Sequence, residues 1–150
     1  MGAQEDLIRK FYTAFQQKDF LTMQSCYHSE ATFSDPVFQN LSSKEVKAMW
    51  QMLLTASKDL KVTFDNVQAN RCHWEAWYSF SRTQRKVHNI IDATFEFRDG
   101  LIYRHHDHFE FRRWARQALG IAGWLPFIRS KVRATARKNL DKFIVEKFRV

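Results

Sequence analysis

The chain has 150 residues, 45% of them hydrophobic and 27% charged, which is enough to bury a core and argues against intrinsic disorder. It has only four Gly residues and no Gly-rich loop, so Walker and Rossmann nucleotide sites are disfavoured. Cys26 and Cys72 are too few for a disulfide framework and lack the Cys-x-x-Cys spacing of zinc sites. No segment reaches the ~20 apolar residues that span a bilayer, and no apolar leader opens the sequence, so we expect a cytoplasmic protein.

The net charge of +8 is distributed unevenly along the chain. Residues 112–150 hold eleven Lys and Arg against two acidic residues, whereas the other 111 residues hold 13 basic and 14 acidic ones. Proteins that bind nucleic acid usually spread a basic face over the fold, so we expect no nucleic-acid partner. The excess charge marks a C-terminal segment and not the chain as a whole.

Apolar spacing predicts helices in the first part of the chain. Residues 4–17 repeat apolar side chains at helical spacing. Asp19 then caps a short second helix, and we place Tyr27 on the apolar face of that helix.

The next segment contains a brief extended piece and a third helix. Residues 31–33 are extended and end at Asp35, because the proline that follows disfavours a helical conformation. Ser42 and Glu45 form a capping box that opens a helix with Trp50 on its apolar face.

From about residue 61 the pattern changes to strands rich in β-branched and aromatic residues. Four strands are predicted, at about 62–67, 74–80, 87–97 and 101–111. Short turns join the last three strands into an antiparallel meander. Helices followed by an antiparallel sheet indicate an α+β fold in which the two layers pack on each other. Beyond the sheet we expect a short helix, an apolar link and a basic amphipathic helix over about 128–147.

Three motifs resemble those of SnoaL-like proteins, in the nuclear transport factor two-like (NTF2-like) superfamily that also includes ketosteroid isomerase and limonene-epoxide hydrolase. They are Phe11-Tyr12-x-Ala14-Phe15-x-x-x-Asp19, Phe33-Ser34-Asp35-Pro36 and Gly100-Leu101-Ile102-x-x-His105-x-Asp107-x-Phe109. The resemblance implies one SnoaL-like domain over 1–150: an NTF2-like cone at about 4–120, with N-terminal helices on a curved antiparallel sheet, and a helical extension at about 121–150. It also implies a homodimer and a hydrophobic small-molecule partner.

The same resemblance suggests residue roles. Asp107 matches the acid–base aspartate of SnoaL-type cyclases and the general acid of the epoxide hydrolase, and Asp35 matches the general base of the isomerase. However, the isomerase's oxyanion-hole tyrosine falls on Phe11, or misses Tyr12 by one position, and its second acid falls on Ala93, so ketosteroid isomerisation is disfavoured. The hydrolase's Arg-x-Asp pair falls near 74–76, where both residue types are missing.

Strand alternation predicts a pocket wall around this aspartate, because residues two apart share a face. The wall on the last strand comprises Tyr103, His105, Asp107, Phe109 and Phe111. Asn89 and Phe95 face the same cavity from the preceding strand, and Tyr12, Trp50 and Tyr78 complete the predicted substrate contacts. A carboxylate against aromatic side chains loses hydration and can exchange protons near neutral pH.

These residues also fit structural interpretations. His105 and Asp107 fit a hydrogen-bonded structural pair, Asp35 fits a turn former, and Tyr12 and Trp50 fit core packing. The run from His105 to His108 also resembles a metal site, but strand alternation leaves two ligands on each face, so we expect neither a metal nor a cofactor.

Three functional hypotheses follow. The first is an isomerase, cyclase or hydrolase that uses Asp107, assisted by His105 and Asp35, on an apolar substrate. The second is a non-catalytic module that binds a hydrophobic ligand. The third is an interaction protein that acts through its C-terminal helix, either on a partner or, through 121–150, on a membrane surface. That helix docks on the cone's open end or on a partner subunit, and 124–127 is a candidate lid.

Overall fold

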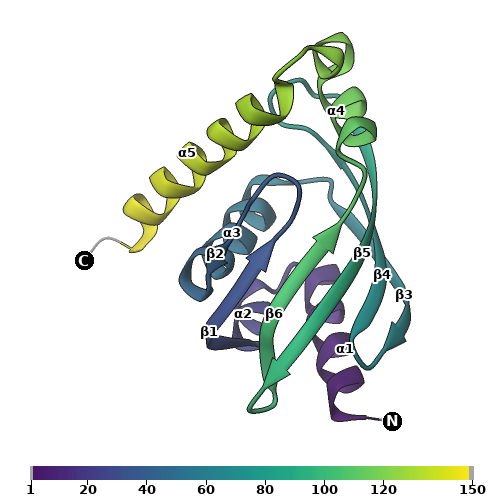
Figure 1. Ribbon diagram of the computed structural model, residues 1–150, viewed down its shortest axis with the longest axis vertical. Coiled ribbons are helices and arrows are strands. Elements are labelled where there is room, and N and C mark those ends of the chain that lie inside the picture. Colours follow the sequence, from purple (N-terminus) through teal and green to yellow (C-terminus); the bar gives the residue numbers. More distant parts are fainter. Residues whose placement is uncertain (1, 149–150) are drawn as a thin grey trace.

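Six strands form one curved, open sheet, and three N-terminal helices cover one of its faces in the computed structural model, which describes residues 2–148 (Figure 1). The strand order is β2-β1-β6-β5-β4-β3. The strands are β1 (Tyr27–Ser34), β2 (Leu41–Ser42), β3 (Lys61–Gln68), β4 (Arg71–Ser79), β5 (Lys86–Arg98) and β6 (Leu101–His108). The predicted α+β class and the antiparallel meander of the last three strands, β4–β6, are confirmed, and β3 also pairs antiparallel with β4.

Strand β1 differs from the prediction. It pairs parallel with β6 and begins at Tyr27, whose register partner is Ile102. The placement of Tyr27 on a helix face was therefore wrong, since helix α2 (Phe20–Ser25) ends before it. Tyr27 is instead almost fully buried against the inner face of the sheet.

The predicted helix starts are confirmed by their caps. The side chain of Asp19 accepts a hydrogen bond from the Thr22 amide at the start of α2. Ser42 and Glu45 form a complete capping box at the start of α3 (Ser43–Ala56). Helix α1 (Ala3–Gln16) presents its apolar side chains to the sheet, as its spacing predicted.

The interior of the cone is filled by aromatic side chains. Phe15 lies with its ring centroid 5.0 Å from that of Trp50 and 5.1 Å from that of Trp74. Alternate residues of β5 point into this core, as predicted. Both cysteines are buried and unbridged.

The chain leaves the sheet earlier than predicted. Strand β6 ends at His108, and the side chain of Glu110 caps helix α4 (Phe111–Leu119) by accepting from the Arg113 amide. Phe111 therefore belongs to α4 and not to the strand wall. The physical reason is Glu110, which caps α4 within two residues of the end of β6.

The last helix, α5 (Ile128–Phe148), docks on the cone beside α3 (Figure 1). Leu140 is fully buried, while most basic side chains of α5 are exposed. Arg133 Nε donates to the carbonyl oxygen of Pro36 at 2.9 Å, and Arg137 pairs with Glu45. These contacts correspond to docking on the cone itself.

Before α5, the chain forms a short turn of helix, η1 (Gly120–Trp124). Trp124 and Phe127 are exposed, so this link does not cover the core and the lid hypothesis is not supported. Within residues 2–148, no helix combines the length and the apolar character that crossing a bilayer requires.

Candidate functional site

A histidine and an aspartate meet in the centre of the cone, on the inner face of β6. His105 Nε2 lies 2.9 Å from Asp107 Oδ1. Each residue is only 2% exposed. The prediction that strand alternation would place these two side chains together on the inner face is confirmed.

Hydrogen bonds extend this pair in both directions. The Tyr27 hydroxyl lies 2.8 Å from His105 Nδ1 and accepts a hydrogen bond from Trp50 Nε1 at 2.9 Å. On the other side, Trp74 Nε1 donates to Asp107 Oδ1 at 3.4 Å. Side chains from β1, α3, β4 and β6 thus form one buried polar chain inside an aromatic core.

The donors available limit the directions of the hydrogen bonds in this chain. Trp50 can only donate, so the Tyr27 oxygen accepts from it and is free to donate its own proton to His105 Nδ1. Burial raises the pKa of Tyr27 well above its ordinary value, which keeps this hydroxyl protonated. On its other side, His105 Nε2 lies within hydrogen-bonding distance of Asp107 Oδ1, so a proton on this nitrogen is donated to the carboxyl group.

Tyr12 contributes a second buried hydroxyl beside this chain. Its ring centroid lies 5.9 Å from that of Trp74 and 6.4 Å from that of Phe95. Burial, and next the negative charge of Asp107, raise its pKa well above the ordinary value. Within residues 2–148 this hydroxyl has no hydrogen-bond partner. It is a protonated donor that no protein group uses.

Asp35 lies at the turn after β1, close enough to Asp107 for the two charges to repel. Its Oδ1 accepts from the amides of Val37 at 2.7 Å and Phe38 at 2.6 Å, so it forms the predicted turn. The residue is partly exposed, but protein atoms crowd its carboxyl group. That desolvation raises the pKa of Asp35 to about 7, with the repulsion from Asp107 adding to the effect.

The structure brings some of the other predicted substrate-contact residues close to the His105–Asp107 pair. Phe95 lies 4.5 Å from the His105 ring, centroid to centroid, and belongs to the centre. Asn89 is buried on the inner face of β5. Tyr78 packs against both the central core and a second apolar cluster, and its hydroxyl accepts from Trp114 Nε1 at 2.8 Å and not from the His105–Asp107 pair.

The prediction that Tyr103 shares the wall with Asp107 is wrong. The β5–β6 register shifts between Glu96 and Phe97, which leaves Tyr103 as an extra residue and breaks the alternation. Its ring lies 3.9 Å beneath the guanidinium carbon of Arg98. This bulge arises from the pairing of two strands, so the sequence pattern of β6 alone does not predict it.

Sequence reasoning did not identify Tyr27 or Trp74 as partners of the pair. Alternation along its strand places Trp74 on the inner face of the sheet, the face that also carries Asp107 on β6. This pattern could have indicated Trp74 from the sequence. Tyr27 had no such signal, because its spacing also fits the preceding helix.

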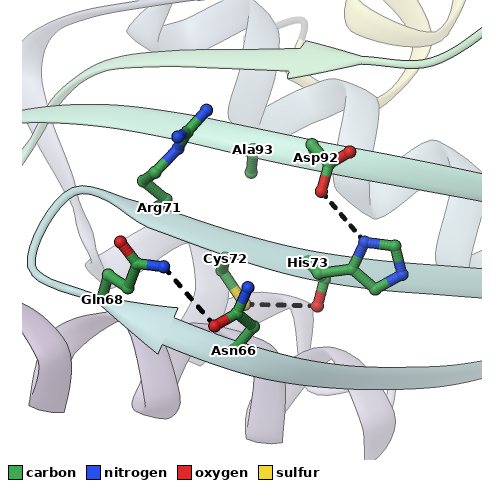
Figure 2. A pocket seen from close by; sticks show the side chains of 7 residues that line it. All are labelled: Asn66, Gln68, Arg71, Cys72, His73, Asp92 and Ala93. Carbon is green, nitrogen blue, oxygen red and sulfur yellow. Dashed lines mark hydrogen bonds and ion pairs between the residues drawn. The ribbon is translucent and has the colours of Figure 1, made fainter.

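Cavities also open at the surface. One, of about 220 Å³, lies near the β3–β4 turn, and its lining includes Arg71, Cys72, His73 and Asp92 (Figure 2). Another, of about 430 Å³, lies over β1, β5 and β6, and its lining includes Phe95 and His105 of the centre as well as outward-facing residues such as Arg104. Neither is lined by Asp107, so neither is the predicted apolar pocket. Within the part of the chain that the structure describes, no three metal-ligating side chains are placed to hold an ion.

The SnoaL-like domain family matches residues 8–105, well over half of the chain. The chain belongs to this family. The match runs from within α1 through β5 and most of β6, including His105, whereas Asp107 and helices α4 and α5 of this SnoaL-like protein follow the matched residues. No curated protein matches the sequence.

Solved structures share the fold of this SnoaL-like protein at low sequence identity. An NTF2-like protein of unknown function from Burkholderia pseudomallei is 12% identical, with a TM-score of 0.65 over 79% of this chain and 99% of that one. A protein from Streptomyces antibioticus, provisionally described as a polyketide cyclase, is 19% identical, with a TM-score of 0.63 over 76% and 96%. An LEH-like epoxide hydrolase from M. tuberculosis is 15% identical, with a TM-score of 0.61 over 78% and 90%. These likenesses establish the fold.

Proposed function

We propose that this SnoaL-like protein is an enzyme that transfers a proton on a hydrophobic small molecule, with Asp107 as the acid–base group. The observation that carries the proposal is the buried His105–Asp107 pair beside the unpartnered Tyr12 hydroxyl. Structures similar to this chain include an epoxide hydrolase and a provisional polyketide cyclase, which are consistent with small-molecule chemistry on this fold.

Buried polar groups stabilise a core less than apolar side chains of similar size do. Replacing a buried, paired charge by apolar side chains is often neutral or stabilising. A buried hydroxyl without a partner costs about 1–3 kcal/mol. A buried group whose pKa is raised by burial and by a nearby charge, as the pKa of Tyr12 is, is typical of functional sites. The unpartnered Tyr12 hydroxyl beside the His105–Asp107 pair therefore supports a functional role for this centre.

The proposed step uses each group once. Asp107 takes a proton from the substrate carbon next to a carbonyl and later returns it to another atom, so no net proton is consumed. The His105 Nε2 proton holds Asp107 Oδ1 and orients the carboxylate. Tyr12 donates to the substrate oxygen on which negative charge develops, a position that favours a donor with no competing partner.

Substrate access requires part of the structure to move, because Asp107 and His105 are each 2% exposed. The segment that follows Asp35 is the best candidate. It lies near Asp107, and Arg133 of α5 is hydrogen bonded to it at Pro36. We propose that α5 and this segment move together to admit an apolar substrate.

A non-catalytic binding module is the second candidate. Both ring nitrogens of His105 and Oδ1 of Asp107 already have partners inside the protein, which also suits a fixed structural pair. In that case the protein binds an apolar ligand and releases it unchanged.

The test measures ligand binding and turnover together. Apolar ketones and epoxides are screened for binding by native mass spectrometry, and bound compounds are analysed for conversion. The variant is Asp107→Asn, and its matched control is Asp65→Asn, the same change at an exposed position on β3. We expect Asp107→Asn to bind the compound but to lose about 10²-fold or more in kcat. Equal turnover by both variants rejects the acid–base role, and binding without conversion by the unmodified protein favours the binding module.

A further inference from the structure

The backbone of η1 and of the link to α5 lies at the end of the molecule opposite the N-terminus (Figure 1), and its exposed apolar side chains form what we call the tip. We define the tip by four side chains of η1 and the link to α5, which are Ile121, Trp124, Leu125 and Phe127, with exposed fractions of 88%, 62%, 56% and 87%. Scattered exposed apolar residues are normal, but four within seven positions form a patch that marks an interaction site.

Positively charged side chains lie beside the tip. Between Glu110 and Asp141 the chain has eight Lys and Arg and no acidic residue. The guanidinium of Arg116 lies 4.8 Å from the Trp124 ring centroid. The β4–β5 hairpin adds Arg85, whose Nε donates to the carbonyl oxygen of Gln117 at 2.8 Å. Basic side chains from two separate segments therefore meet beside the apolar patch.

The backbone holds the tip in a fixed conformation. A Cβ built on the buried Gly123 would lie 2.5 Å from the carbonyl oxygen of Ala115, so this glycine allows η1 to pack directly on α4. Phe127 has φ of 65°, a left-handed conformation that is costly for an aromatic residue. Its ring is nevertheless exposed, so packing within the protein does not compensate for this cost.

We propose that the tip docks on the surface of membranes rich in anionic phospholipids. Tryptophan and phenylalanine side chains partition into the headgroup region, and arginines beside them contact the lipid phosphates. A second copy of this chain fits less well, because two tips facing each other would bring their arginines together without acidic partners. The proposal does not depend on the function proposed above.

The test uses the full chain and vesicles of defined composition. Co-sedimentation is measured with phosphatidylcholine vesicles and with vesicles that also contain about 30% phosphatidylserine. We expect binding to the anionic vesicles that weakens as salt is raised. Trp124→Ala/Phe127→Ala should reduce partitioning by about tenfold or more, and Arg116→Glu should also reduce it.

Matched controls change similar residues elsewhere. Leu21→Ala/Leu53→Ala removes two exposed leucines outside the tip, and Lys10→Glu reverses one charge on α1. Both should bind as the unmodified protein does. The proposal is overturned if the unmodified protein does not bind anionic vesicles, or if the tip and control variants bind equally. It is also overturned if the tip variant converts a dimer to a monomer, which would assign the tip to a protein interface.

Discussion

The two faces of the sheet carry clusters of the same residue types in different environments. On the inner face, His105 is bonded to Asp107 at 2.9 Å. On the outer face, Glu75 lies 2.8 Å from His73 and 2.6 Å from His88, and His73 also contacts Asp92 at 2.9 Å. The distances are similar. The exposed fractions differ: the inner side chains are 0% and 3% exposed, whereas the outer side chains are 26–68% exposed.

This difference shows that burial, more than residue type or spacing, separates the candidate site from a surface network. The outer carboxylates raise the pKa of His73 because Glu75, and next Asp92, accept hydrogen bonds from its ring, but water and salt screen these contacts. Water and salt do not screen the buried hydrogen bond between His105 and Asp107. The stability of each buried side chain therefore depends on the presence of the other. Several experiments can break or sharpen this comparison.

The largest expected effect is on stability. His105→Ala should lower the free energy of unfolding by about 3–5 kcal/mol, because it leaves Asp107 buried without its partner and opens a cavity. His73→Ala on the outer face is the matched control and should cost about 1 kcal/mol or less. Urea denaturation of both variants measures the difference. An equal loss of unfolding free energy in the two variants would contradict the conclusion that burial makes the inner pair more important for stability than the outer cluster.

A smaller effect concerns the pH dependence contributed by Asp35. Its pKa rises from an ordinary 3.8 to about 7 in the folded protein, so between these values the folded state binds more protons than the unfolded state. This contribution therefore stabilises the fold as pH falls from about 7 towards 4, and it is lost as pH rises through 7.

Asp35→Asn keeps the acceptor oxygen of the turn but cannot titrate. Relative to this variant, the unmodified protein should gain about 1–2 kcal/mol between pH 8 and pH 5, after allowance for solvent screening. Thermal unfolding of both proteins across this range measures the gain. Parallel stability curves would show that the Asp35 carboxyl is ionised in the folded protein as in the unfolded chain.

Much of the fold follows from local sequence signals. The caps at Asp19 and Ser42, the meander and the inward face of β5 depend on short-range chemistry and alternation, and they are confirmed. The errors arise where distant segments decide the outcome. A bulge between two strands displaces Tyr103, and parallel pairing with β6 takes Tyr27 from a helix to a strand.

The candidate site was predictable to the same extent. His105 and Asp107 followed from alternation within one strand. The bonds from Tyr27, Trp50 and Trp74 required three other elements to be positioned first. The closure of the centre by packed aromatic rings, and the docking of α5 at Pro36, depend on tertiary packing that no single segment encodes.

The most direct measurement of the central claim combines unfolding and turnover in Tyr12→Phe. The matched control is Tyr27→Phe, since both hydroxyls are buried but only that of Tyr27 is hydrogen bonded. We expect Tyr27→Phe to lose about 1–3 kcal/mol of stability, whereas Tyr12→Phe should be as stable as the unmodified protein or more so. On a substrate that the protein converts, Tyr12→Phe should nevertheless lower kcat by about 10²-fold. Unchanged turnover in a stable Tyr12→Phe variant would contradict the claim that this centre performs chemistry.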